Sequence, residues 1–427
     1  MGQGLLAPSF QRIDGALWCE GVPLQQLAES AGTPAYVYSS SSIRGQFARL
    51  SGALAAIPHR VHYAVKANGN LAILALLRSL GCDVDVVSGG ELHRAFAAGF
   101  QADRTIFGGV GKTSAELAYA LRNGVHVLSV ESADELDIID RLAGDLGVRA
   151  RVGLRVNPEV TVESTHDYIK TGQKGDKFGI PVDQALTVAT RAATLPNVAL
   201  VAIGMHIGSQ LTDLAAYGDG LVRLEELIVA VRSLGVSSLE YLDVGGGLFV
   251  PYADEDPADL ERYVALIRPV VERTRLTLVV EPGRFLVAEA GVLVTRVLYR
   301  KRSGGRTLLV TDAGMNDLIR PSHYQAYHRI EAVDGIATRA TFDVVGPICE
   351  SGDFLAIGRE LEDVSSGALL CVFTAGAYGY CMSSNYNARP RPAELMVDGD
   401  RWAVVSMRET CEDLVRLETA TPTWRNG

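Results

Sequence analysis

One pattern repeats from about residue 60 to about residue 285: a short β-branched run, a turn, and then a segment with the apolar spacing of a helix. We expect strands at Val61–Val65, Cys82–Ser88, Thr105–Gly108, Val125–Val130, Ala150–Val156, Val198–His206, Leu239–Val244 and Leu276–Glu281. Helical segments lie between them, for example Leu71–Leu80, Glu91–Ala98, Ser114–Arg122, Ala133–Leu146, Val182–Ala193 and Pro257–Thr274. Parallel-type strands that are each followed by a helix predict an α/β chain with a (β/α)8 barrel of the TIM type rather than a doubly wound sheet.

The pattern changes after about residue 290. Short alternating runs separated by Gly, Pro and Asn turns predict a second, mostly antiparallel β domain, and the short strand Ala35–Tyr38 is expected to pack onto it. A chain of 427 residues is also too long for one compact core. We therefore predict a barrel domain over residues 42–290 and a β domain built from residues 1–41 and 291–427.

Composition excludes several classes of partner. Forty Lys and Arg against fifty Asp and Glu give a net charge of -10, which argues against nucleic acid or an anionic membrane as the main partner. No apolar run is long enough to span a bilayer, and the first residues lack the pattern of a secretory signal. The six cysteines are scattered, without the spacing of a metal site or a disulfide framework. A cytoplasmic protein without a bound metal is expected.

In a barrel of this type, chemistry is built at the carboxyl ends of the strands. The first predicted strand runs into Lys66, where loss of solvent favours the neutral, nucleophilic amine, although most lysines at strand ends are simply solvated. The seventh strand runs into Gly245-Gly246-Gly247, and the eighth into Glu281-Pro282-Gly283-Arg284. Consecutive glycines let backbone N–H groups approach a phosphate, and an arginine adds a charged fork to the same anion.

The sixth predicted strand ends near His206 and Ser209. The imidazole can stack on a flat ring and the hydroxyl can donate to a phosphate, although a core histidine and a capping serine would look the same. Together with Lys66, Glu281 and Arg284, these residues suggest pyridoxal 5'-phosphate as the cofactor. Lys66 would hold it as a Schiff base, Glu281 would keep the pyridine nitrogen protonated, and Gly246, Gly247 and Arg284 would hold the phosphate.

Several motifs, taken together, resemble the diaminopimelate decarboxylase family, within the alanine-racemase-like barrel group of pyridoxal-phosphate enzymes. The resemblance extends essentially from end to end, from Tyr36-Val37-Tyr38 to Asn385-Tyr386-Asn387. The motifs are Tyr63-Ala64-Val65-Lys66-Ala67-Asn68, Asp85-Val86-Val87-Ser88-Gly89-Gly90-Glu91, His206-Ile207-Gly208-Ser209-Gln210, Glu281-Pro282-Gly283-Arg284, Gly346-Pro347-Ile348-Cys349-Glu350-Ser351-Gly352-Asp353 and Gly376-Ala377-Tyr378.

The resemblance implies roles for individual residues. Lys66 and Cys349 would be catalytic, with Cys349 as the proton donor after carbon dioxide leaves. Cofactor contacts would come from Lys66, Asp85, His206, Ser209, Gly246, Gly247, Glu281, Pro282, Gly283, Arg284 and Tyr378. Because the Cys349 motif reaches the site from the other subunit in this family, the resemblance also implies a homodimer with shared active sites.

Substrate choice depends on fewer residues. The segment Thr165–Gly172 and the motif Met315-Asn316-Asp317-Leu318-Ile319-Arg320-Pro321 are similar to the diaminopimelate branch. Substrate contacts are predicted from Arg284, Arg320, Tyr324, Glu350 and Tyr378. Meso-diaminopimelate carries an amino group and a carboxylate at each end, so Arg320 can bind the distal carboxylate and Glu350 the distal ammonium. The expected reaction is its decarboxylation to L-lysine, the last step of lysine biosynthesis.

Alternatives remain open at this point. A related decarboxylase could act on ornithine, arginine, carboxynorspermidine or a carrier-bound glutamyl group, although Arg320 would oppose a substrate without a distal carboxylate. An amino-acid racemase fits less well because Cys349-Glu350 belongs to the decarboxylase motif. A cofactor-binding protein without activity is a third alternative. Such a protein would be expected to lack Lys66 or Cys349, and this sequence has both.

Overall fold

The computed structural model describes residues 9–160, 172–335 and 338–425. The chain divides into two compact units. One contains residues 43–251 and 255–287, and the other contains residues up to 42, residues 252–254 and residues from 288 onward. The limits predicted from the sequence are close to these, but the prediction did not separate residues 252–254 from the barrel. That the two parts are independent domains stays a prediction.

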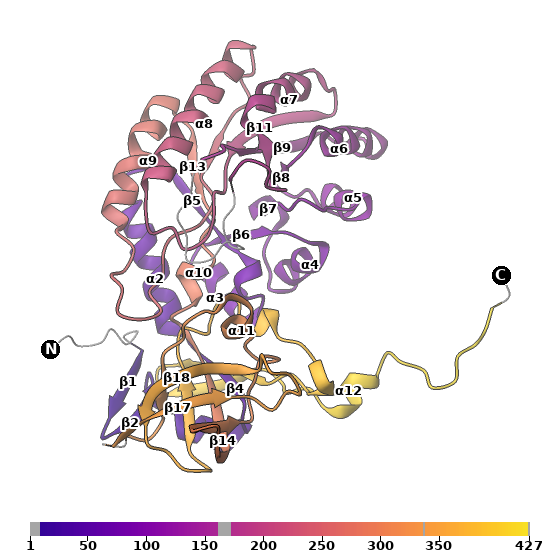
Figure 1. The fold of residues 1–427 in the computed structure, drawn as a ribbon. Helices are drawn as coiled ribbons and strands as arrows, with labels where there is room; N and C mark the ends of the chain where they lie inside the picture. Colours follow the sequence, from indigo (N-terminus) through magenta and orange to yellow (C-terminus); the bar gives the residue numbers. More distant parts are fainter. Residues whose placement is uncertain (1–8, 161–171, 336–337, 426–427) are drawn as a thin grey trace. The chain divides into compact units, whose positions relative to one another are not determined.

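The first unit is a closed ring of parallel strands surrounded by helices, which confirms the predicted barrel (Figure 1). The ring strands are β5 (His59–Ala64), β6 (Asp83–Val86), β7 (Thr105–Phe107), β8 (Val127–Val130), β9 (Ala150–Asn157), β11 (Val198–Gly204), β12 (Tyr241–Asp243) and β13 (Thr277–Val280). Pairing of β13 with β5 and of β8 with β9 closes the ring. A two-residue strand, β10 (Ile180–Pro181), pairs in parallel with the last two residues of β9.

The helices follow the strands in regular alternation. They are α2 (Ser40–Ala53), α3 (Leu71–Ser79), α4 (Gly89–Ala97), α5 (Ser114–Asn123), α6 (Ala133–Leu146), α7 (Val182–Thr194), α8 (Ala215–Ser233), α9 (Leu260–Thr274) and α10 (Arg284–Val287). Local signals explain their ends: the Ser132 hydroxyl accepts from the Glu135 N–H at the start of α6, and Gly147 closes that helix in the left-handed region.

The second unit is built around a mixed sheet with the order β18-β17-β15-β14-β4-β20-β21. Its strands are β4 (Ala35–Ser39), β14 (Gly291–Ser303), β15 (Arg306–Thr311), β16 (Ile330–Ala332), β17 (Arg339–Val345), β18 (Phe354–Glu362), β19 (Leu369–Val372), β20 (Ala393–Asp398) and β21 (Arg401–Ser406). Most pairs are antiparallel, as predicted, whereas β15–β17 and β4–β20 are parallel. A small sheet of β1 (Phe10–Ile13), β2 (Ala16–Cys19) and β3 (Val22–Pro23) belongs to the same unit.

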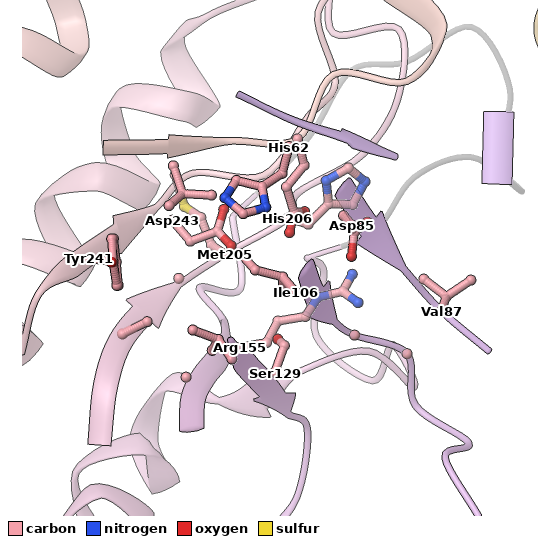
Figure 2. A pocket seen from close by; sticks show the side chains of 18 of the residues that line it. His62, Asp85, Val87, Ile106, Ser129, Arg155, Met205, His206, Tyr241 and Asp243 are labelled. Atoms are coloured by element: carbon pink, nitrogen blue, oxygen red, sulfur yellow. The ribbon is translucent and has the colours of Figure 1, made fainter. Parts of the chain in front are cut away.

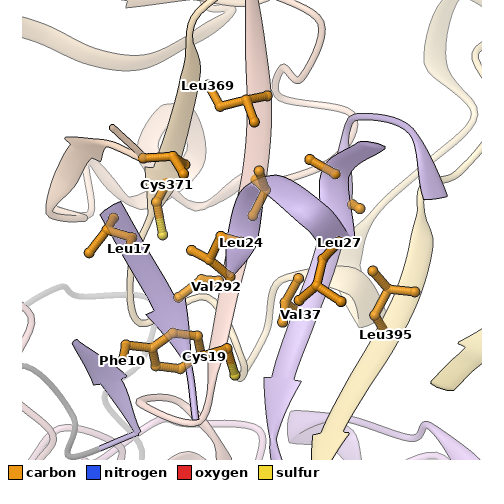
Figure 3. Close-up of a cluster of buried hydrophobic side chains, with 14 of the residues drawn as sticks. Phe10, Leu17, Cys19, Leu24, Leu27, Val37, Val292, Leu369, Cys371 and Leu395 are labelled. Atoms are coloured by element: carbon orange, nitrogen blue, oxygen red, sulfur yellow. The ribbon is translucent and has the colours of Figure 1, made fainter. Parts of the chain in front are cut away.

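The described part of this unit also contains the short helices α1 (Leu24–Ala31), α11 (Arg320–Tyr324) and α12 (Cys411–Val415). Its apolar core joins segments from both parts of the chain (Figure 3). Val37 of β4, Val292 of β14 and Leu395 of β20 are completely buried there, beside Leu24 and Leu27 of α1. Strand β4 contributes five buried residues, so the N-terminal segment belongs to the sheet as predicted. No helix among the residues described here is long and apolar enough to cross a membrane.

Candidate active site

Lys66 lies in a single 3-10 turn (Val65–Ala67) directly after β5, at the carboxyl end of the barrel. Its amine is 3.8 Å from a carboxylate oxygen of Asp85, and Asp85 itself is buried near the end of the neighbouring strand β6. Burial raises the pKa of Asp85, Glu281 adds to this, and the nearby Lys66 opposes it. The predicted amine is therefore placed among carboxyl groups rather than in bulk solvent.

Glu281 follows β13, and its backbone N–H donates to the Gly245 carbonyl at 2.8 Å. Burial raises the pKa of Glu281 to about 8, with a further contribution from Asp243. Asp243, the last residue of β12, has its pKa raised to about 7, again mainly by burial. The two carboxyl groups are hydrogen-bonded to each other, so at neutral pH the pair can hold or release a proton inside the barrel.

His206 lies in the loop after β11 and lines the same pocket as Asp243 and Glu281. Its Nδ1 accepts a hydrogen bond from the Gly246 N–H at 3.0 Å, which makes Nε2 the protonated nitrogen of the neutral ring. Burial lowers the pKa of His206, and the positive charges of Lys66 and Arg155 lower it further. The Gly246 N–H was predicted to face a phosphate. In this structure it donates to His206 Nδ1, and the phosphate contact of Gly246 stays a prediction.

Arg284 is 6% exposed and begins the short helix α10. Its Nε and one terminal nitrogen are 3.3 and 3.2 Å from the Ser209 hydroxyl. Space next to the adjoining glycine turn is tight: a Cβ added to Gly247 would lie 2.7 Å from the Gly208 carbonyl oxygen. A cation and a hydroxyl thus lie beside a glycine turn with no room for a side chain, and guanidinium and hydroxyl groups are donors that can bind a phosphate.

The pocket beside Lys66 is lined by side chains from several barrel strands (Figure 2). Charged lining residues that were not among the predicted site residues include Asp243, and Arg155 on β9. Arg155 forms a 2.9 Å ion pair with Glu131, and its guanidinium carbon is 5.1 Å from the centre of the Phe178 ring. Both residues lie at carboxyl ends of predicted strands, so the rule that selected Lys66 and Glu281 could also have selected them.

Pro282 and Gly283 follow Glu281 in the barrel unit, and the other remaining predicted residues belong to the β unit. Arg320 is 6% exposed at the start of α11, and its guanidinium carbon is 5.8 Å from the ring centre of Tyr324. Cys349 and Glu350 are both exposed in the segment between β17 and β18. The Cys349 N–H donates to the Asn387 side chain at 2.8 Å. Tyr378 has a left-handed backbone, with φ of 55°. Because Cys349 is exposed, it does not fill the core of this unit.

The structure brings several of the predicted site residues together within each unit. In the barrel unit, Lys66 and Asp85 lie together, as do Glu281 with the glycine turn and Arg284 with Ser209. In the β unit, Arg320 and Tyr324 lie together. Most of the segment Thr165–Gly172, to which substrate choice was partly assigned, lies outside the residues that the structure describes.

Comparison with known proteins identifies the class first. Residues 40–288 match the family model described as the pyridoxal binding domain of pyridoxal-dependent decarboxylases. A diaminopimelate decarboxylase from Pseudomonas fluorescens is 48% identical over 97% of this chain and 99% of its own length. Among solved structures, diaminopimelate decarboxylase from M. jannaschii in complex with L-lysine superposes with a TM-score of 0.93 at 34% identity, covering 98% of this chain and 99% of that one.

The Helicobacter pylori diaminopimelate decarboxylase, also in complex with L-lysine, superposes with a TM-score of 0.89 at 38% identity over 92% of this chain and 99% of that one. Fold, site and full-length similarity agree. The chain belongs to the diaminopimelate decarboxylase family of pyridoxal-dependent decarboxylases.

Proposed function

We propose that this chain decarboxylates meso-2,6-diaminopimelate at its D centre to give L-lysine and carbon dioxide, with pyridoxal 5'-phosphate as cofactor. The observation that carries the proposal is the Lys66 amine, 3.8 Å from buried Asp85 and lining the same pocket as Asp243 and Glu281. An amine suits the aldehyde of this cofactor, a carboxyl pair suits its ring nitrogen, and Arg284 with Ser209 suits its phosphate. The residues present therefore fit the group.

When bound, the cofactor supplies an electron sink for the electron pair left behind by carbon dioxide. The protein's own groups supply the rest. Lys66 would hold the cofactor through its side-chain amine, and Glu281 would hold a proton at the ring nitrogen. Arg284 and Ser209 would fix the phosphate end, while the His206 ring would lie against the flat cofactor ring. Cys349 would deliver a proton from its thiol to the carbon that has lost carbon dioxide.

Substrate specificity is assigned to the β unit. A buried guanidinium with an aromatic neighbour, as at Arg320, binds a carboxylate far better than the same group in water. Glu350 would bind the distal ammonium, and Tyr378 would contact both the cofactor phosphate and the substrate. The product L-lysine keeps the distal carboxylate, which agrees with the L-lysine present in the two related structures.

The decisive experiment is carbon dioxide release from a panel of amino acids, with and without added cofactor. We expect release from meso-diaminopimelate only, and release from ornithine, arginine or carboxynorspermidine would overturn the assignment. Arg320→Lys should weaken the binding of diaminopimelate roughly tenfold or more, because lysine keeps the charge but cannot form two parallel hydrogen bonds to one carboxylate. The matched control is Arg300→Lys, since Arg300 forms a surface ion pair with Asp363 and was not assigned to the site. Unchanged kinetics of Arg320→Lys would remove the main support for this substrate.

We also propose a homodimer whose sites combine Lys66 of one chain with Cys349 of the other. Lys66→Ala and Cys349→Ala should each be nearly inactive alone. A mixed dimer would have one site with both lesions and one intact site, so co-expression with two different tags should restore about half the activity, by counting sites. If both residues came from the same chain, every site would keep one lesion and no activity would return. An active Cys349→Ala homodimer would reject the chemical role of Cys349.

A further inference from the structure

The guanidinium of Arg320 is held between aromatic rings. Its central carbon lies 5.0 Å from the ring centre of Tyr252 and 5.8 Å from that of Tyr324. Tyr252 comes from the three-residue stretch that belongs to the β unit although barrel elements precede and follow it in the sequence. Contact with ring faces restrains the plane of a guanidinium, but it does not fix which of its N–H edges points in a given direction.

His328 fixes that direction. Arg320 Nε donates to His328 Nε2 at 3.3 Å, and His328 Nδ1 lies 2.9 Å from the Phe373 carbonyl oxygen. A carbonyl oxygen can only accept, so Nδ1 must carry the hydrogen, and a guanidinium can only donate, so Nε2 must present its lone pair. Both contacts are satisfied by one tautomer of a neutral ring. The two hydrogen bonds therefore determine the tautomer of His328, a neutral ring with its hydrogen on Nδ1.

The imidazole is itself firmly placed. His328 is fully buried, and its ring meets Tyr252 edge-on, with ring centres 5.2 Å apart and an angle of 89° between the planes. Its backbone carbonyl accepts a 2.8 Å hydrogen bond from Arg359, whose guanidinium carbon is 3.9 Å from the ring centre of Tyr327. The acceptor that faces Arg320 thus cannot move without disturbing several packed groups.

We infer that His328 is a positioning residue that sets the substrate specificity assigned to Arg320. Because Arg320 Nε already donates to His328, the side fork formed by Nε and one terminal nitrogen is engaged. A carboxylate then binds end-on, between the two terminal nitrogens, in one orientation. The inference deepens the proposed function and rests on it, since it assumes that Arg320 binds the distal carboxylate.

Two variants separate the roles of the histidine. In His328→Asn the shorter amide can still donate to the Phe373 carbonyl but no longer reaches Arg320. In His328→Gln the side chain is long enough to offer Arg320 an acceptor again. The assay is calorimetric binding to the cofactor-loaded protein of L-lysine, which has the carboxylate, and of 1,5-diaminopentane, which lacks it.

We expect His328→Asn to lower the affinity for L-lysine roughly ten- to a hundredfold and to leave the affinity for 1,5-diaminopentane unchanged. His328→Gln should restore most of the lost affinity for L-lysine. In an Arg320→Ala background, His328→Asn should have no further effect on L-lysine. His93→Asn, on the exposed surface of α4, is the matched control and should bind both ligands as the parent does.

Equal weakening of both ligands, or a drop in cofactor affinity, would show a merely structural role and overturn the inference. So would unchanged binding of L-lysine by His328→Asn. The proposed function fails differently: the parent protein itself would then bind L-lysine no better than 1,5-diaminopentane, and Arg320→Lys would change neither.

Discussion

Gly246→Ala tests the placement of the glycine turn against Glu281. A Cβ added at Gly246 would lie 2.4 Å from the Glu281 carbonyl oxygen and 3.3 Å from its carbonyl carbon. Ordinary contact begins at 3.4 Å, so the backbone of the two strand ends must separate by about 1 Å. The Glu281 N–H is bonded to Gly245, so neither segment can yield without moving the carboxyl group.

The cost follows from that displacement. Overpacking of this kind costs about 1–3 kcal/mol, which corresponds to a roughly 5- to 150-fold loss of cofactor affinity if it falls on the binding-competent state. A misplacement of about 1 Å near the reacting atoms lowers turnover about a hundredfold. Cofactor affinity is measured by absorbance titration, and turnover by carbon dioxide release at saturating cofactor.

Gly90→Ala is the matched control. A Cβ at Gly90 would meet nothing closer than the Ser88 hydroxyl at 3.7 Å, and the residue lies in the first turn of α4. The control should therefore bind cofactor like the parent and gain slightly in stability. If Gly246→Ala also bound cofactor and turned over like the parent, the close approach between Gly246 and Glu281 would not position the site, and our reasoning would be refuted.

Three further predictions concern single side chains. Lys66→Ala should abolish the absorbance of bound cofactor and nearly all turnover, and borohydride reduction of the parent followed by peptide mapping should label Lys66 and no other lysine. In cofactor-free protein, burial raises the pKa of Glu281 from its usual 4.5 to about 8. Its contribution to the stability of the fold is therefore present while the carboxyl is protonated and is lost as the pH rises between these two values. Glu281→Gln stays neutral, so its thermal midpoint should fall less than the parent's between about pH 5.5 and about pH 8.5; an equal fall contradicts the assignment. Asp353→Asn should lower the free energy of unfolding by about 1–3 kcal/mol, because the Asp353 carboxylate accepts from the N–H groups of Met315 and Ile348 and an amide has one acceptor only; denaturant unfolding against a surface Asp363→Asn control measures it.

Much of the barrel was predictable because the apolar periodicity and the turn residues indicate the same strands and helices there. The helical signal of α8 is weak in the sequence, since Gly218 and Gly220 lie within it. The structure gives a reason for Gly220: a Cβ there would lie 2.6 Å from the Met205 sulfur. Strand β18 is hard to recognise from the sequence because Gly358, with φ of 58°, interrupts its alternation.

The site shows the same division. Residues at strand ends were found because their place in the sequence determines their place in the fold. Partners that come from distant segments were not found: His328 is significant only because Arg320 and the Phe373 carbonyl lie on either side of its ring. Nor could the sequence show that the Gly246 N–H turns to His206, because that depends on the path of a loop 40 residues away.

Strand β4 has a consequence for how the protein is made. It pairs with β14 on one side and with β20 on the other, so its second partner begins at Ala393. At about 5–20 residues per second, a ribosome needs roughly 20–70 s to synthesise the chain between β4 and β20. For that time, five residues that are buried in the finished sheet have an unpaired strand edge while the barrel is being completed. Newly made chains should therefore depend on chaperones chiefly through this short N-terminal strand, and a ribosome that stalls before β20 leaves it open to pairing with other chains.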